Sequence, residues 1–283
     1  MLVYFTNANG NTFYIQDNYI LSPDWAGFGE VDVEHKMTKA PYQDGKTFID
    51  TIFDERELIV PFLIKADNRQ EVFDRRLIVS NHFNPKLGIG TLTWEQEDGT
   101  RYCIDCIPYA PIFPGGKAQN RWYQEVIIMF VAPNPFWYNP TQGESIMVGF
   151  TGGFSLPFSL PIGFGTVGSQ IDIVNLGSVE TPVMIYFYGE VVNPTIQNLT
   201  TEEEISIIKT IDDGDILIIN TAFGEKAAMI LSGGEYINAF EYVDPASTFW
   251  KLDPGTNTVK YTVTSEGANA QCRLYYYNRY SGV

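Results

Sequence analysis

The chain has 283 residues, enough for two ordinary domains, and 45% of them are hydrophobic, which is sufficient for packed cores. Its formal net charge is −16, with 18 acidic and 12 basic residues up to position 140 and 16 acidic and 6 basic residues after it. No basic block occurs, so the composition argues against a specific nucleic-acid site that holds phosphates. Three cysteines, an odd number, favour reduced thiols made in a cytoplasm.

Neither secretion nor membrane insertion is expected. The N-terminus, MLVYFTNANGN, has no positive flank followed by an apolar core, as a signal peptide would have. No run of residues approaches the roughly 18–20 apolar positions of a membrane-spanning helix.

The first half, residues 1–140, reads as strands with one helix. Asn9-Gly10 favours a hairpin turn, since both residues tolerate positive φ, and Thr38–Lys46 looks like an exposed loop. The helix is expected at Asp67–Phe83, capped by Asp67 with Gln70 three residues on, and ended by Asn84-Pro85. The expected strands are Leu2–Phe5, Thr12–Ile15, Val31–Met37, Glu57–Ile64, Gly90–Glu95, Thr100–Pro108 and Trp122–Val131.

Two of these strands, Glu57–Ile64 and the segment Val126–Val131, are apolar almost without interruption. Such strands are covered on both faces, and Pro61 should lie at an edge or a bulge. The helix can cover the second face of one of these strands, and a neighbouring copy of the chain can cover the second face of the other. We therefore expect a subunit interface that includes Thr38, Tyr42, Lys46, Val60 and Phe62.

Residues 141–168, rich in Gly, Phe, Pro and Ser, predict a docked linker, and residues 169–283 predict a second domain. Short strands separated by Gly, Asp and Asn turns are typical of an antiparallel sandwich. The strands expected there are Ser169–Asn175, Pro182–Glu190, Ile205–Ile208, Asp215–Asn220, Lys226–Ile230, Thr248–Leu252, Thr258–Thr264 and Gln271–Tyr277.

No catalytic, cofactor or metal site is expected. Cys103 and Cys106 form a single Cys-x-x-Cys in a strand, where an odd offset directs the thiols to opposite faces. Asp212–Asp215 lacks the closing glutamate of a calcium loop and fits a hairpin turn. His35 and His82 share no ligand motif. Trp250 and Tyr276 could contact a sugar or a partner, but packing in the core or an interface is the more common role of such residues.

Several motifs, in this order and spacing, resemble the distal tail protein (Dit) family of siphophages. They are NPKLGIGTLTW (Asn84–Trp94), VIIMFVAPNPFWYNP (Val126–Pro140), GEVVNPTIQN (Gly189–Asn198), DGDILIINT (Asp213–Thr221) and LDPGTN (Leu252–Asn257). The resemblance covers nearly the whole chain.

The resemblance implies a mainly β protein. A split-barrel-like domain of the tail-tube type with one α-helix would come first, followed by a galectin-like antiparallel β-sandwich. It also implies a structural virion protein, which forms a hexameric ring at the distal end of the tail. Its implied partners are other copies of itself, the tail tube protein, a tail-associated hub or lysin protein, and receptor-binding or baseplate proteins. DNA would pass through the ring without specific binding.

Three alternatives remain from the sequence. A carbohydrate-binding adhesin would use the second domain, and a tail-tube subunit would share the first domain's fold. A baseplate enzyme would use paired carboxylates, but no nucleophile elbow, phosphate loop or dinucleotide motif occurs. We expect a structural protein and not an enzyme.

Overall fold

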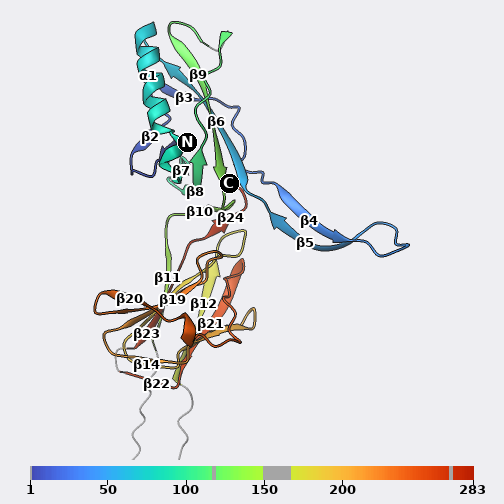
Figure 1. Ribbon diagram of the computed structural model, residues 1–283, viewed down its shortest axis with the longest axis vertical. Helices are drawn as coiled ribbons and strands as arrows, with labels where there is room; N and C mark the ends of the chain where they lie inside the picture. Colours follow the sequence, from blue (N-terminus) through green and yellow to red (C-terminus); the bar gives the residue numbers. More distant parts are fainter. Residues whose placement is uncertain (1, 117–118, 149–166, 268–269) are drawn as a thin grey trace, which may run out of the picture. The chain divides into compact units, whose positions relative to one another are not determined.

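A computed structural model describes residues 2–116, 119–148, 167–267 and 270–283. The chain forms two compact units (Figure 1). Unit 1 comprises Met1–Pro140 together with Tyr280–Val283, and unit 2 comprises Thr141–Arg279. No helix among the described residues is both long and apolar enough to cross a membrane.

Unit 1 contains ten strands, the single α-helix and a short 3₁₀ helix among its described residues up to 140. The elements are β1 (Leu2–Thr6), β2 (Thr12–Tyr14), β3 (Tyr19–Leu21), β4 (Val33–Thr38), β5 (Thr47–Phe53), β6 (Arg56–Lys65), α1 (Arg69–His82), η1 (Pro85–Leu87), β7 (Gly90–Glu95), β8 (Arg101–Pro108), β9 (Tyr123–Ala132) and β10 (Trp137–Tyr138).

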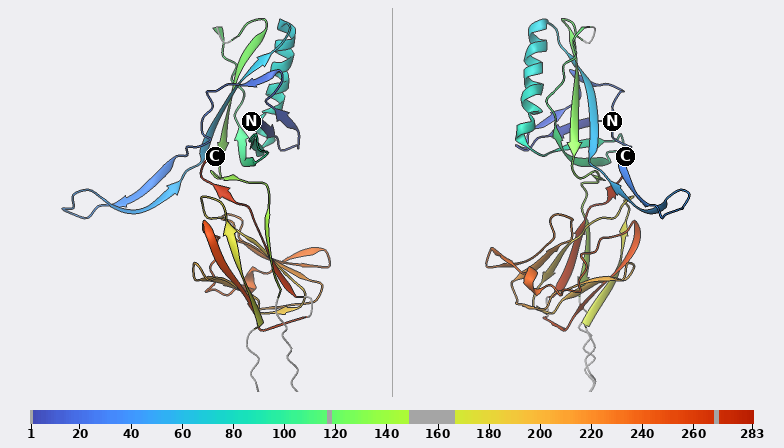
Figure 2. Two further views of the ribbon diagram at one scale, coloured as in Figure 1. Left: turned by 180° about the vertical axis from the view of Figure 1, so that it is seen from behind. Right: turned by 45° about the vertical axis from the view of Figure 1, so that its right-hand side comes forward.

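The main sheet of unit 1 is antiparallel and runs in the order β2-β1-β7-β8-β9-β6-β3. One of its faces lines an aromatic core. In that core, Phe83 at the end of α1 stacks on Phe5, with ring centroids 5.4 Å apart, and meets Phe13 edge-on at 5.2 Å. Helix α1 lies along this sheet (Figures 1 and 2) and contributes the buried side chains of Val72 and Val79.

Helix α1 begins two residues later than the sequence indicates. Asn68, not Asp67, is the N-cap, and its side-chain oxygen accepts from the backbone N–H of Glu71 at 3.0 Å. Glu71 in turn accepts from the backbone N–H of Asp67 at 2.8 Å, so Glu71 replaces Gln70 as the partner in the capping box.

Strands β4 and β5 form a two-stranded hairpin that extends away from the rest of unit 1 (Figures 1 and 2). We call residues 33–53 the arm. Strand β5 was not predicted, and only the turn of the arm occupies the expected loop Thr38–Lys46.

Unit 2 is an antiparallel sandwich. One sheet has the order β11-β23-β13-β18-β19-β20 and the other β12-β21-β15-β16, and β17, β14 and β22 form a small third sheet. The elements are β11 (Gly143–Val148), β12 (Val167–Asn175), β13 (Met184–Tyr188), β14 (Val191–Val192), β15 (Thr195–Asn198), β16 (Glu203–Ser206), β17 (Thr210–Ile211), β18 (Ile216–Asn220), β19 (Ala227–Ser232), β20 (Glu235–Asn238), η3 (Phe240–Tyr242), β21 (Gly255–Val263), β22 (Ser265–Glu266) and β23 (Gln271–Tyr276). The last strand, β24 (Arg279–Tyr280), pairs with β10 in the sheet of unit 1.

Several segments of unit 2 differ from expectation, among them β15 and β20, which no expected strand contains. Residues 143–148 of the expected linker form β11, which pairs with β23. The rest of that linker, residues 149–166, lies outside the described residues. Thr248–Leu252 forms no strand and contributes only an isolated bridge between Leu252 and Thr181.

A buried arginine joins separate parts of unit 1. Arg56 is 1% exposed, and its Nε donates to the carbonyl of Pro135 at 2.7 Å. One terminal nitrogen donates to the carbonyls of Gly27 and Glu30, both at 2.7 Å, and the other donates to the carbonyl of Ser281. Gly27 is required beside it, because φ is +86° and a Cβ would lie 2.0 Å from the carbonyl oxygen of Glu57.

We predict that Arg56→Met lowers the free energy of unfolding of unit 1 by roughly 3 kcal/mol or more, because it leaves several buried carbonyls without donors. Calorimetric thermal unfolding measures this effect. The control is Arg101→Met, which removes an exposed ion pair with Glu95 and should cost no more than about 1 kcal/mol. Equal effects of the two substitutions would contradict the role assigned to Arg56.

Candidate assembly surface

The arm is amphipathic, and its register shows which side chains share a face. Paired residues point to the same side of a hairpin, and successive pairs alternate between sides. The pairs Val33–Phe53, His35–Thr51 and Met37–Phe48 therefore share one face, which we call the apolar face. The pairs Glu34–Ile52, Lys36–Asp50 and Thr38–Thr47 form the opposite, polar face.

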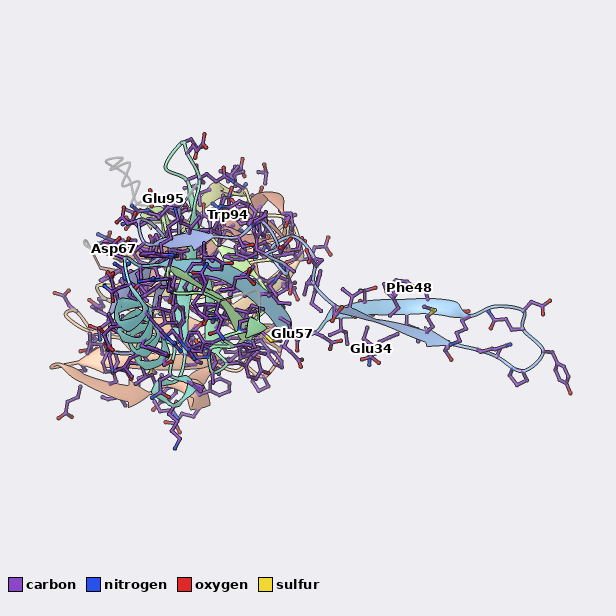
Figure 3. All side chains as sticks on the ribbon, turned by 90° about the horizontal axis from the view of Figure 1, so that it is seen from above. Glu34, Phe48, Glu57, Asp67, Trp94 and Glu95 are labelled. Carbon is purple, nitrogen blue, oxygen red and sulfur yellow. The ribbon has the colours of Figure 1, made fainter. Side chains whose placement is uncertain are left out.

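Side-chain contacts agree with this division. On the apolar face, His35 Nδ1 lies 2.9 Å from Thr51 Oγ1, and the imidazole meets the ring of Phe48 with centroids 6.5 Å apart. On the polar face, Lys36 and Glu34 form an ion pair. Figure 3 labels one residue from each face, Phe48 and Glu34, on the extended arm.

The apolar face carries exposed side chains. Met37 is 48% and Phe48 61% exposed, and Ile49, the extra residue at the bulge of the hairpin, is 62% exposed. A two-stranded hairpin is marginally stable in water by itself, and contiguous apolar surface of this kind marks a contact with another molecule. The sequence did not identify Phe48 or Ile49, because their strand carries no regular alternation of apolar and polar residues.

Three of the predicted interface residues lie on the arm. Thr38 and Lys46 flank its turn, and Tyr42 lies within it. Tyr42 is fully exposed and has φ +63°, a backbone conformation that is costly for a bulky residue. The turn holds it there through Gln43, whose side chain accepts from Ala40 N at 3.0 Å and donates to Thr47 Oγ1 at 3.0 Å.

The other two predicted interface residues lie elsewhere. Val60 and Phe62 are each 1% exposed and point into the core of unit 1, so they cannot form a contact between subunits in the folded chain. The opposite face of β6 carries the half-buried Ile59, Pro61 and Leu63. Val60 and Phe62 were therefore wrong as interface residues, because they lie on the core side of β6.

Pro61 occupies a break in the pairing of β6. On the side of β6 opposite β9, β3 pairs with β6 only up to Phe62, and the next bridge joins Ala26 to Ile59. Between them, the carbonyl of Pro61 accepts from the backbone N–H of Ser22 at 2.9 Å. The missing N–H of proline would point to this same interrupted side, so Pro61 costs no ladder hydrogen bond.

The described residues contain no group of three or more His, Cys, Asp or Glu side chains placed to hold a metal ion. Cys103 and Cys106 are both buried, and burial raises the pKa of each thiol. Cys106 packs in the core of unit 1, while Cys103 lies on the other face of β8 beside Thr93. His82 is half-buried, and this burial lowers its pKa.

The two aromatic residues considered for sugar contact both pack within unit 2. Trp250 is 1% exposed, and its indole N–H donates to the carbonyl of Ile196 at 3.3 Å. Its ring therefore has no open face on which a sugar could stack. Tyr276 packs beside the core, and its hydroxyl donates to the carbonyl of Val174 at 3.4 Å.

Comparisons with known proteins agree with this architecture. Residues 8–132 match the phage tail protein RIFT-related domain, and residues 176–280 match the siphovirus-type tail component, C-terminal domain. No curated protein sequence matches the chain.

Solved structures resemble it over their full lengths. The crystal structure of Dit of phage SPP1, described as a paradigm of the hub adsorption apparatus in phages that infect Gram-positive bacteria, is 13% identical with a TM-score of 0.68 and 99% coverage of each chain. A chain of the phage P2 baseplate, in its activated conformation with Ca, is 12% identical with a TM-score of 0.54 and 100% coverage of each chain.

These matches define a tail component of siphophage type, and they confirm the expected mainly β fold with its single helix. The chain belongs to the distal tail protein (Dit) family. Members of this family are structural proteins of the virion.

The different burial of β6 and the arm gives a stability prediction. Val60→Asp places a carboxylate in the core of unit 1 and should cost more than about 4 kcal/mol, enough to unfold the unit. Phe48→Asp on the arm should change the free energy of unfolding of the dispersed chain by less than about 1 kcal/mol. Denaturant titration of both variants measures the difference. A folded Val60→Asp variant of normal stability would contradict the assigned orientation of β6.

Proposed function

We propose that the protein is the distal tail hub of a siphophage and that six copies of unit 1 form a closed ring, in which each arm lies on a neighbouring copy. The observation that carries the proposal is the exposed apolar face of the arm. A contact between unlike surfaces, repeated around an axis, closes into a ring when the rotation is correct. The family resemblance supports the number six.

The attachment of the arm supports this use. Strand β5 leads directly into β6, whose first residue is the buried Arg56, and the residues before β4 include Gly27 and Glu30, which Arg56 binds. Phe53, at the base of the apolar face, meets Phe136 with ring centroids 5.3 Å apart. Both strands of the arm are therefore fixed at their base, and the exposed part projects in a defined direction from unit 1.

The proposed hub joins the tail tube protein to a tail-associated hub or lysin protein and to receptor-binding or baseplate proteins at the distal end of the tail. The net charge of −16 suits a ring through which DNA passes, since it repels phosphates instead of retaining them. The ring needs no chemistry of its own, and its proposed function is attachment.

The mass of the purified chain tests the ring. Light scattering or native mass spectrometry should give six times the chain mass of 31.9 kDa. Phe48→Asp should yield species smaller than the hexamer, because it places a charge on the apolar face. The matched control is Ile52→Asp, on the polar face of the same hairpin and 47% exposed, which should keep the ring.

A wild-type chain that remains monomeric at high concentration would contradict the ring. Dispersal by Ile52→Asp to the same extent as by Phe48→Asp would contradict the assignment of faces. Tyr42→Gly adds a second readout, since it relieves the positive φ and removes the exposed ring. If the ring of Tyr42 contacts the neighbour, this variant assembles more weakly although its turn is no less stable.

A further inference from the structure

Strand β20 leaves one side of its backbone unpaired. It is the last strand of the sheet β11-β23-β13-β18-β19-β20 (Figure 1), and all four of its residues are exposed. The opposite sheet ends differently at β16. There, Thr248 N donates to Glu204 O at 2.8 Å and Asp244 N to Ser206 O at 2.9 Å, so an irregular segment covers that edge.

The register identifies the unpaired groups of β20. Ala239 N donates to Ala228 O at 2.8 Å, and the pairs Ile230–Ile237 and Ser232–Glu235 continue the same alternation. In an antiparallel ladder only every second residue bonds to a given neighbour. Glu235 and Ile237 therefore bond to β19, while the N–H and C=O groups of Tyr236 and Asn238 point to the open edge. Among the described residues, no backbone group meets them there.

This edge is short and begins with the charged Glu235, but it lacks other features that usually prevent strand addition. It has no lysine, proline or bulge, and it begins at the tight turn Gly233-Gly234. Tyr236 is 66% and Ile237 53% exposed, on opposite faces of the sheet. Just beyond the strand, Phe240 stacks on Phe249 with centroids 5.7 Å apart and interplanar angle 10°, and extends the apolar flank.

The charge around the edge indicates what can bind. Residues 227–250 include the acidic Glu235, Glu241 and Asp244 and no lysine or arginine. Two lysines from neighbouring segments lie nearby, Lys226 over the ring of Phe249 and Lys209 over the ring of Tyr242, so carboxylates outnumber ammonium groups by three to two. Another copy of β20 would bring the same carboxylates and would be repelled. A neutral or basic segment would be attracted.

We propose that the open edge of β20 accepts an extended, neutral or basic segment of a different protein, which adds a strand to the sheet. Its backbone pairs with Tyr236 and Asn238, and an apolar side chain lies beside Ile237 and Phe240. The proposal does not depend on the ring, because every group that it uses lies in unit 2.

Synthetic peptides test the proposal on the full-length chain. The probe is an eight-residue peptide of alternating lysine and valine with blocked ends. One control peptide has the same side chains with alternate backbone nitrogens methylated, and another has glutamate in place of lysine. Fluorescence anisotropy should show at least tenfold weaker binding of both controls. Hydrogen–deuterium exchange with residue-level fragmentation should show the amides of Tyr236 and Asn238 protected by the probe.

Two matched variants complete the test. Ile237→Lys should weaken binding of the probe at least tenfold, whereas Phe223→Lys, at a 90% exposed position in the turn between β18 and β19, should change it less than twofold. Equal binding of the methylated peptide, or protection without Tyr236 and Asn238, would overturn the proposal. A third result would also overturn it. If the Phe48→Asp variant forms dimers without peptide, and adding Ile237→Lys disperses those dimers, then a second copy of the chain fills the edge.

Discussion

The buried guanidinium of Arg56 is the interaction on which the shape of unit 1 depends. It binds carbonyls of the loop before β4, of Pro135 and of Ser281, three segments far apart in the sequence. A buried charge is tolerated only where hydrogen bonds replace the lost water, and here the partners are backbone groups that would otherwise be unsatisfied. Burial lowers the pKa of Arg56 to about 10, so the side chain stays charged through the neutral range.

This arrangement places a buried polar cluster at the base of the arm. Arg56 follows β5 directly, and its carbonyl partners Gly27 and Glu30 precede β4. The carboxylate of Glu30 also accepts from Gly27 N at 2.9 Å, which lowers the pKa of Glu30 and fixes the loop. The arm can expose apolar side chains and still keep its direction, because the constraint comes from its base and not from its length.

The sequence predicts much of the fold and little of the assembly surface. Turn residues and apolar runs indicated most strands of unit 1, though not β3, β5 or β10, and Asn84-Pro85 marked the end of the helix, because these signals are local. The orientation of β6 was not predictable, since an uninterrupted apolar strand gives no sign of which side faces the core. Val60 and Phe62 were therefore assigned to the interface although their neighbours Ile59, Pro61 and Leu63 form the outer face.

The arm was predicted only in part, without β5, for a related reason. Its apolar residues Met37 and Phe48 belong to a face that no part of unit 1 covers, so their pattern resembles neither a core strand nor a polar loop. The sequence did not distinguish Asp67 from Asn68 as the N-cap of the helix, because both residue types favour that position. The hydrogen bonds of Glu71 to these two residues decide between them. Apolar patterns in a sequence indicate which residues lie in the chain's own core, and they indicate less well which surfaces another chain covers.

The two exposed elements differ in the information that they present to a partner. The apolar face of the arm offers area, and the hydrophobic effect has no preferred direction. A closed ring of six copies requires the same angle between each copy and the next. The apolar contact does not set this angle, but the fixed base of the arm can. The edge of β20 offers donors and acceptors at strand spacing, which fix register but bind any extended backbone. Discrimination there must come from Ile237, Phe240 and the acidic surroundings. A rigid base therefore suits contact between identical copies, and a charged open edge suits the selection of a different protein.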